Sequence, residues 1–364
     1  MPSVTTESSP ERRQDHHAGD LDVLDDPSWF LDRLDLKRGH GLFTRAKRDV
    51  LSGAVFLDQS WNRGGAAQCA LPISAIRAYQ GSAPSPATIW HSAFCCSTLI
   101  ANCLDAPGTS LAVKEPMALL DLDQALQDTP EQADGRLVSA VFSLVGRGSA
   151  PGERAVIKPS NAVNAMIPAV AANTAGPMLL LYSNCRDFIL SVARGGGVVG
   201  GIEDRRRFAR DLMTQRVLHQ RPGVRWRPED LYTLTDLQIT ALVWHAQMAE
   251  FRAVARTLGP RRARSLDCDV FLANPRRCLD HLDCFLGLGL GSARTEAITS
   301  GPKLSRHAKQ PHMAFGAAGR RRAWSIVEIE LGASLGELIE WSYRVCPETP
   351  RDDPVGAPLI PMDA

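Results

Sequence analysis

The residues best placed for chemistry in this 364-residue chain lie between an expected strand and an expected helix, within residues 88–104. β-Branched and aromatic residues begin this stretch, and apolar residues at helical spacing end it. Ser97 is a favoured residue for capping a helix, so the turn over residues 92–98 directs its backbone N–H groups toward the helix N-terminus. Together with the hydroxyls of Ser97 and Thr98, these donors suit an anion such as a phosphate, because the helix dipole is positive there.

The same loop lacks the features of the common nucleotide-binding sequence GxxxxGK[ST]. That sequence uses glycines for close approach of the backbone and a lysine for positive charge. The corresponding places are taken here by Ala93, Phe94, Cys95 and Cys96. A strand, a turn and a capped helix also occur in many α/β proteins. The loop alone therefore leaves open whether it binds an anion or only connects two elements.

Charged residues follow two further expected strands. Residues 110–114 end in Lys114 and are followed by Glu115, and residues 154–158 end in Lys158. Open α/β sheets bind ligands in the crevice beyond the C-terminal ends of their strands. We therefore expect these charges to lie at one edge of a sheet, beside the anion loop. The alternative is that they only pair with neighbours on the rim.

The elements that must position these residues alternate along the chain. Strand–helix units begin near Thr88, Ser110, Arg154 and Pro177. This alternation predicts a mostly parallel sheet with helices on both faces, which is a doubly wound α/β domain. We assign residues 87–364 to this domain.

The remaining segments are expected to surround that sheet. Residues 1–20 are polar and without periodicity, so we expect them to be disordered. Residues 21–86 are expected to form an N-terminal layer packed on the core, with a helix that begins at residues 25–28 and a strand over residues 54–61.

Two basic segments lie in the second half of the chain. Residues 200–260 are expected to form a helical insertion, in which the run Arg205–Arg207 is most simply a solvated face. Residues 301–312 are polar and rich in loop formers. Arg306 and Lys309 in that segment could close over an anionic ligand, because loops on a rigid scaffold frequently carry binding groups.

Composition excludes several classes of protein. The 41 basic and 40 acidic residues give a net charge of +1, so nothing in the charge balance suggests a partner among nucleic acids or membrane surfaces. No apolar run approaches the length of about 20 residues that a membrane span needs, and the N-terminus lacks the apolar region of a secretory signal. The nine cysteines are irregularly spaced and match no zinc-ligand pattern. We therefore expect a cytoplasmic protein with reduced thiols and no metal site.

Five segments, taken in order, resemble motifs of the sulfotransferase family. These enzymes have a P-loop-type fold and move a sulfuryl group from 3′-phosphoadenosine-5′-phosphosulfate (PAPS) to an acceptor hydroxyl or amine. FCCSTLI resembles the family's phosphosulfate loop, VKEP its REP, and VIKPSN its LKSP. YSNCRDFILS is similar to RDPRDVVAS, and SLDCDVFLANPRRCLDHLDCFLGL is similar to the late stretch that ends in FLGL. The resemblance runs from about residue 88 to about residue 309.

The resemblance implies roles for individual residues. Glu115 would be the base that deprotonates the acceptor, and Lys158 or Lys114 would supply positive charge at the leaving phosphate. The implied cofactor contacts are Cys95, Cys96, Ser97 and Thr98 for the 5′-phosphosulfate, Ser183, Arg186 and Ser191 near the 3′-phosphate, and Arg306 and Lys309 as further cations. The chain departs from the family at Phe94, which stands where the loop carries positive charge, and at Ser183, which stands where an arginine holds the 3′-phosphate.

Three hypotheses follow from these residues. The first is an active PAPS-dependent sulfotransferase that acts on a small molecule. The second is a catalytically inactive relative that binds a nucleotide or a phosphorylated ligand, which the two departures favour. The third is a P-loop kinase or NTPase, which the absence of a lysine before Ser97 disfavours. The identity of the acceptor and the oligomeric state are not encoded in any of these motifs.

Overall fold

The computed structural model describes residues 23–61, 63–81, 84–195, 202–219, 225–314 and 316–360. The predicted disorder of residues 1–20 lies outside the described residues.

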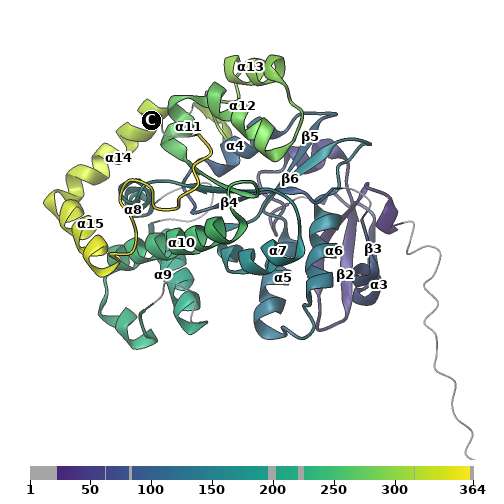
Figure 1. Cartoon of the computed structure of the whole chain (residues 1–364), viewed down its shortest axis with the longest axis horizontal. Coiled ribbons are helices and arrows are strands. Elements are labelled where there is room, and N and C mark those ends of the chain that lie inside the picture. The colour runs from purple at the N-terminus through teal and green to yellow at the C-terminus, as the bar shows by residue number, and fades with distance from the viewer. Residues whose placement is uncertain are drawn as a thin grey trace, which may run out of the picture.

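A five-stranded sheet forms the centre of the molecule (Figure 1). Its strands are β4 (Ala87–His91), β5 (Ser110–Lys114), β6 (Arg154–Lys158), β7 (Met178–Tyr182) and β8 (Ala263–Asp267). They are arranged in the order β5-β6-β4-β7-β8, and every neighbouring pair is parallel. All residues of β4, β5 and β7 are buried, as expected for apolar strands covered on both faces. The predicted parallel sheet is therefore confirmed.

Helices cover both faces of this sheet. One face packs against α4 (Ser97–Leu104), α11 (Cys268–Ala273) and α12 (Pro275–Leu286). The other packs against α5 (Met117–Asp128), α6 (Gly135–Val145), α7 (Ile167–Asn173), α8 (Cys185–Arg194) and α10 (Asp236–Leu258). Successive strand residues alternate between the two cores: Ile89 belongs to the first and Trp90 to the second. The doubly wound α/β class predicted from the sequence is confirmed.

The N-terminal layer is a second, antiparallel sheet. It consists of β1 (Trp29–Asp35), β2 (His40–Arg45) and β3 (Gln68–Pro72), with the short helix α3 (Ile73–Ala78) beside it. The other short helix of this segment, α2 (Arg48–Gly53), lies against β5 of the central sheet. It is tied to the main domain by the ion pair between Arg33 and Asp121 of α5, in which Nε lies 2.7 Å from Oδ2.

Two expectations for this layer are wrong. The helix predicted to begin at residues 25–28 is instead strand β1, because its apolar residues pair with β2. The side chain of Asp26 accepts a hydrogen bond from the backbone N–H of Ser28 (2.8 Å), which closes a local turn with the same chemistry that caps a helix. The strand predicted over residues 54–61 is also absent. That segment runs past the end of β5, where Leu57 N–H donates to Lys114 O at 2.8 Å.

The later part of the chain is mostly helical. Besides α10, it contains α9 (Ile202–Leu218), α13 (Ser292–Ser300), α14 (Ala317–Leu331), α15 (Ala333–Val345) and the short 3-10 turn η2 (Pro228–Thr233). A similar turn, η1 (Asn161–Met166), lies earlier, between β6 and α7. The polar segment 301–312 carries the small antiparallel pair β9 (Arg306–His307) and β10 (Gln310–Ala314) instead of a plain loop. Among the described residues, no helix combines the length and apolar character that crossing a membrane would require.

Candidate functional site

Glu115 and Lys158 lie side by side at the C-terminal edge of the central sheet. β5 and β6 are paired in parallel with Lys114 opposite Lys158, so Glu115 is the first residue beyond that register. Its backbone N–H donates to Lys158 O at 2.7 Å, and the Lys158 ammonium donates to its carboxylate. The Lys158 side chain is completely buried, whereas 18% of the Glu115 side chain is exposed. The two residues predicted to be catalytic are thus in direct contact.

The backbone of Glu115 has a left-handed conformation, with φ of 51°. For residues other than glycine this conformation costs about 1–2 kcal/mol. Such strain persists where the surroundings hold it in place, and it is concentrated at functional sites. The backbone of Glu115 is held in this conformation by its hydrogen bond and its ion pair with Lys158.

Lys114 has other partners. It lies opposite Lys158 in the parallel register, so both side chains leave the same face of the sheet, but the Lys114 ammonium donates to Ser52 O (2.6 Å) and Asn102 Oδ1 (3.0 Å). Burial lowers the pKa of Lys114 to about 8. Of the two lysines at these strand ends, Lys158 is therefore the one that can serve the site.

His91 lies next to Glu115, and it was not predicted from the sequence. It is the last residue of β4, directly before the anion loop. Its Nδ1 accepts the backbone N–H of Ala93 (3.2 Å), so the proton is on Nε2, which donates to Pro159 O (3.1 Å). Burial and the charges of Lys158 and Lys309 hold the pKa of His91 well below its usual range. A neutral His91 thus lies with Nε2 4.0 Å from the Glu115 carboxylate.

The predicted anion loop is strongly curved. Ala93, Phe94 and Cys96 all have positive φ, at 73°, 52° and 60°. Cys96 is the residue that caps α4, and Ser97 is the first helical residue, so the prediction of Ser97 as the cap is off by one. In the described part of the chain, the backbone N–H groups from residue 94 to residue 98 have no hydrogen-bond partner. The loop therefore presents a cluster of unpaired donors at a helix N-terminus, as an anion site requires.

Arg320 of α14 contacts this loop at Phe94 and Cys96, and it was not predicted from the sequence. Its Nη2 donates to Phe94 O (3.2 Å), and its Nη1 lies 3.6 Å from Cys96 Sγ and 3.3 Å from Cys268 Sγ. A hydrogen bond from Cys268, together with the charge of Arg320, lowers the pKa of Cys96, whereas burial raises the pKa of Cys95 to about 11. The adjacent residues 320–322 are all arginines, which is the only sequence signal for this contact.

Arg205 supplies a second cation beside the loop. Its guanidinium lies 4.9 Å from the ring centre of Phe94, and its Nη1 donates to Ser191 O at 2.6 Å. The interpretation of residues 205–207 as a solvated face is thus wrong for Arg205, which is half-buried, and right for Arg207, whose side chain is 83% exposed.

The residues predicted around the 3′-phosphate are differently placed. Ser191 is brought to the loop through Arg205. Ser183 is completely buried, its carbonyl accepts the indole N–H of Trp244 (2.7 Å), and its hydroxyl has no partner among the described residues. Arg186 is paired with Glu328 of α14, and both side chains are about two-fifths exposed.

Of the two cations predicted in residues 301–312, Lys309 reaches the site. Its ammonium lies 4.9 Å from the ring centre of Phe56, and the ammonium of Lys158 lies 5.4 Å from the same ring. Burial and the charge of Lys158 lower the pKa of Lys309. Phe56 comes from the N-terminal layer and was missed. Arg306 is exposed, and within the described ranges no ion pair joins it to the cluster.

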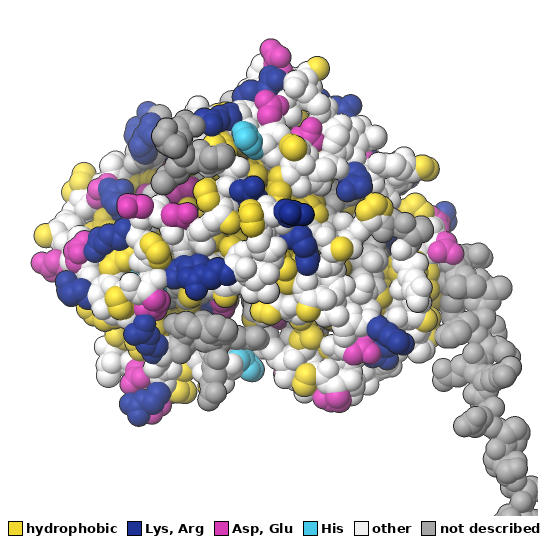
Figure 2. Space-filling view, in the orientation of Figure 1, with side chains coloured by type: hydrophobic (Ala, Val, Ile, Leu, Met, Phe, Trp, Pro, Cys, Tyr) yellow, Lys and Arg dark blue, Asp and Glu magenta, His cyan; other side chains and the backbone are white. Residues whose placement is uncertain are grey.

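Two further observations describe the charges around the site. In Figure 2, basic and acidic side chains are interspersed over the visible face instead of forming one large basic patch. Next to Arg320, the side chains of Asp267, Cys268 and Asp269 each offer an atom that could bind a metal ion, and these atoms lie within 4.8 Å of one another. Arg320 Nη1, however, lies 3.5 Å from Asp269 Oδ1 and already supplies positive charge there. We therefore treat this cluster as the counter-charge of Arg320.

Comparison with known proteins finds distant similarity only. No protein-family model and no curated protein matches the sequence. Among solved structures, the chain is similar to a sulfotransferase domain from the curacin biosynthetic pathway, with 12% identity, a TM-score of 0.42, and coverage of 71% of this chain and 97% of that one. It is also similar to a sulfotransferase from Alicyclobacillus acidocaldarius, with 14% identity, a TM-score of 0.33, and coverage of 73% and 96%.

Proposed function

We propose that this chain binds PAPS and transfers its sulfuryl group to a hydroxyl or amine of a small-molecule acceptor. The observation that carries the proposal is the pair of Glu115 and Lys158 at the C-terminal ends of neighbouring parallel strands, beside a loop of unpaired N–H donors. A carboxylate, a buried lysine and an anion cradle are the groups that transfer from an activated phosphate ester requires.

The donor set around the loop fits a polyanionic ligand. The N–H groups of residues 94–98 and the hydroxyls of Ser97 and Thr98 would hold the 5′-phosphosulfate, because unpaired donors at a helix N-terminus favour anions. Lys158 and Lys309 lie against the same ring, that of Phe56, and would add positive charge. These cations compensate for Phe94, which replaces the charged residue of the family's loop.

The 3′-phosphate would be held on the other side of Phe94. We propose that Ser191 and Arg186 contact it, joined by Arg205, which already donates to the Ser191 carbonyl. Arg186 would first have to leave Glu328, a half-exposed ion pair of the kind that contributes only about 0–1 kcal/mol. Arg205 needs no such rearrangement. It is therefore the stronger substitute for the arginine that Ser183 replaces.

PAPS supplies an activated sulfuryl group whose S–O bond to the 5′-phosphate breaks during transfer. In the reaction, Glu115 would accept the proton of the acceptor hydroxyl or amine as the new bond to sulfur forms. Lys158 would then donate to the phosphate oxygen on which negative charge develops, and stabilisation of such charge is the largest contribution in many enzymes. Neutral His91 is a fixed neighbour of the Glu115 carboxylate, since both nitrogens of its ring are hydrogen-bonded.

The second candidate is a protein that binds such a ligand without turnover. It is favoured by the Lys158–Glu115 contact, which occupies the proposed base. A P-loop kinase or NTPase is disfavoured, because the strands that flank β4 end in Lys158 and Tyr182 and not in a carboxylate that could hold Mg²⁺.

Equilibrium binding and a single-turnover assay separate these candidates. The purified chain should bind PAPS and its desulfated product, 3′-phosphoadenosine 5′-phosphate, and bind ATP more weakly. When the PAPS-saturated protein is mixed with a panel of phenols, alcohols and amines, desulfated product should appear faster than in a mixture without acceptor. Binding without any acceptor-dependent release would identify the non-catalytic candidate, and tighter binding of ATP than of PAPS would exclude the proposal.

A further inference from the structure

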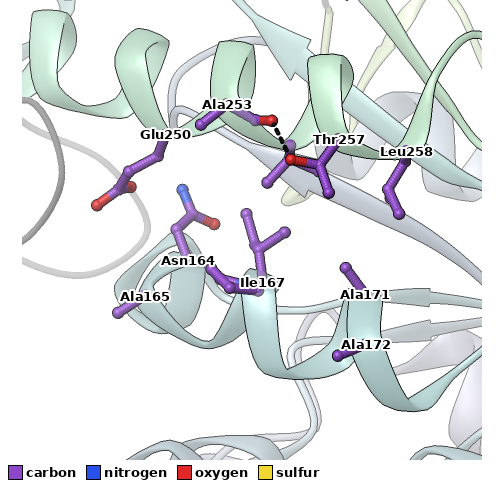
Figure 3. A pocket seen from close by; sticks show the side chains of 11 residues that line it. Asn164, Ala165, Ile167, Ala171, Ala172, Glu250, Ala253, Thr257 and Leu258 are labelled. Carbon is purple, nitrogen blue, oxygen red and sulfur yellow. Dashed lines mark hydrogen bonds between the residues drawn. The ribbon is translucent and has the colours of Figure 1, made fainter.

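A groove separate from the reaction site lies between α7 and α10 (Figure 3). It has a volume of about 230 Å³, and its walls are the apolar and small side chains of Ile167, Ala171, Ala253 and Val254, among others. Asn164 and Glu250 lie together at one end of it. Neither Glu115 nor Lys158 lines the groove, so it does not belong to the site described above.

The end formed by Asn164 and Glu250 contains acceptors that lack donors. Asn164 is 1% exposed, and its Nδ2 donates to His91 O (3.1 Å) and Gln247 Oε1 (3.3 Å), which fixes the orientation of the amide. Its Oδ1 is thereby turned toward Ile167 in the groove (Figure 3), without a partner in the described part of the chain. Buried polar atoms of this kind are rare in proteins and call for an explanation.

Glu250 repeats this arrangement. It is 9% exposed, and its Oε2 accepts from Arg216 Nη2 at 3.0 Å. Its Oε1 has no partner among the residues that the structure describes. Two buried oxygens, both acceptors, therefore lie at the same end of one apolar groove.

These groups define the chemistry of a ligand. Its head must donate hydrogen bonds to these acceptors, as an ammonium does through its three N–H groups. A carboxylate or sulfate head has no donor and would meet the Glu250 carboxylate. The body of the ligand must be apolar and small. A dry cavity of about 150 Å³ is known to hold benzene, so this groove has room for an aromatic ring with a short alkyl chain. We propose that the groove binds a small primary amine with an aromatic or aliphatic body.

The site is also connected to the reaction centre. Asn164 would contact the head of the ligand through Oδ1 while its Nδ2 holds the carbonyl of His91. The amide is thus a single rigid group between the groove and His91, whose Nε2 lies 4.0 Å from the Glu115 carboxylate. The binding proposal itself does not depend on PAPS chemistry, and its test therefore uses the unliganded protein.

The probe is 2-phenylethylamine, and 3-phenylpropanoate serves as a probe of similar size with an anionic head. Calorimetric titration and thermal unfolding of the full chain measure binding without any activity. We expect the amine to bind and to raise Tm, as any ligand of the folded state does. We expect 3-phenylpropanoate to bind at least roughly tenfold more weakly, because its carboxylate has no donor for Asn164 Oδ1 or Glu250 Oε1.

Substitutions in the walls locate the binding. Ala253 and Ala172 both line the groove and are both exposed. Ala253→Leu and Ala172→Leu should therefore fill the groove and remove the Tm shift. Ala169→Leu lies on the same helix as Ala172, outside the lining, and should preserve the shift. Absence of amine binding, equal binding of the propanoate, or an unchanged shift in both wall variants would overturn the proposal. A dimer that Ala253→Leu dissociates would assign the groove to a second copy of the chain and overturn it as well.

Discussion

Lys158 donates a hydrogen bond to the carboxylate of Glu115 across two neighbouring parallel strands, from a side chain that is completely buried. The parallel register that places Lys114 opposite Lys158 makes this contact possible, since Glu115 turns back over the strand end with a positive φ. Removing one partner of a buried ion pair typically costs about 3–5 kcal/mol, because the other charge is then left buried and unpaired. The proposed base is thus held in position by the group that would stabilise the leaving phosphate.

The first prediction tests Glu115 as the base. Glu115→Gln preserves the shape and an oxygen that can accept the Lys158 hydrogen bond, but it carries no negative charge and cannot accept a proton. PAPS affinity should persist while transfer to the acceptor falls by ~10²–10⁴. Single-turnover release of the desulfated product from saturated protein measures the change. Glu131→Gln, at an exposed position, is the matched control. A wild-type rate no faster than that of Glu115→Gln would favour binding without catalysis.

The second prediction concerns the anion loop. Cys96 has a left-handed conformation and its Sγ contacts Arg320, so Cys96→Phe should displace the arginine and obstruct the N–H donors. Affinity for PAPS should fall by roughly a hundredfold or more, because two lost hydrogen bonds to a charged group are worth about 3–6 kcal/mol. Cys96→Gly, which suits the positive φ, should preserve binding. Equal affinity in Cys96→Phe and wild type, with far-UV circular dichroism unchanged, would remove the loop from the site.

The third prediction separates the two candidate arginines for the 3′-phosphate. Adenosine 5′-phosphosulfate lacks that phosphate, so Arg205→Ala and Arg186→Ala should each weaken PAPS more than adenosine 5′-phosphosulfate. We expect a loss of roughly tenfold to a hundredfold for Arg205→Ala, as for a charge-assisted hydrogen bond, and a smaller one for Arg186→Ala. Arg207→Ala, at an exposed position of the same basic run, is the control. If a variant weakens both ligands alike, that arginine does not contact the 3′-phosphate.

The fourth prediction is a pH dependence of stability that arises from Lys114. Burial lowers its pKa to about 8, against 10.5 for an ordinary lysine. Between these values the unfolded chain binds the proton and the folded chain does not, so this lysine makes stability rise with pH from about pH 8 upward. The free energy of unfolding of wild type minus that of Lys114→Met should therefore increase across this window, at most by about 1.4 kcal/mol per pH unit. Urea unfolding at pH 7 to 10 checks this, with the exposed Lys37→Met as the control for loss of one charge. Parallel pH profiles of wild type and Lys114→Met would contradict it.

The sequence by itself determined the central sheet and the ends of its strands. Strands β5 and β6 were predicted with the same residues that the structure shows, because short apolar runs between a turn and a proline leave little freedom in their limits. Since parallel strands share one C-terminal edge, the proximity of Glu115 and Lys158 follows from their positions in the sequence. The turn proposed to bind an anion was located for the same reason, as the connection between a buried strand and a helix.

Only the tertiary structure decided which other groups join that edge. Arg205, Arg320 and Phe56 come from segments far from the loop in sequence, and a single basic or aromatic residue carries no signal of what it will contact. The misassigned strand β1 has the same cause: apolar residues at 29, 30 and 34 suit a helix face, and pairing with β2 overrides that preference. Local patterns fix the period and limits of buried elements, whereas contacts between distant segments depend on how whole layers pack, which no short window of sequence contains.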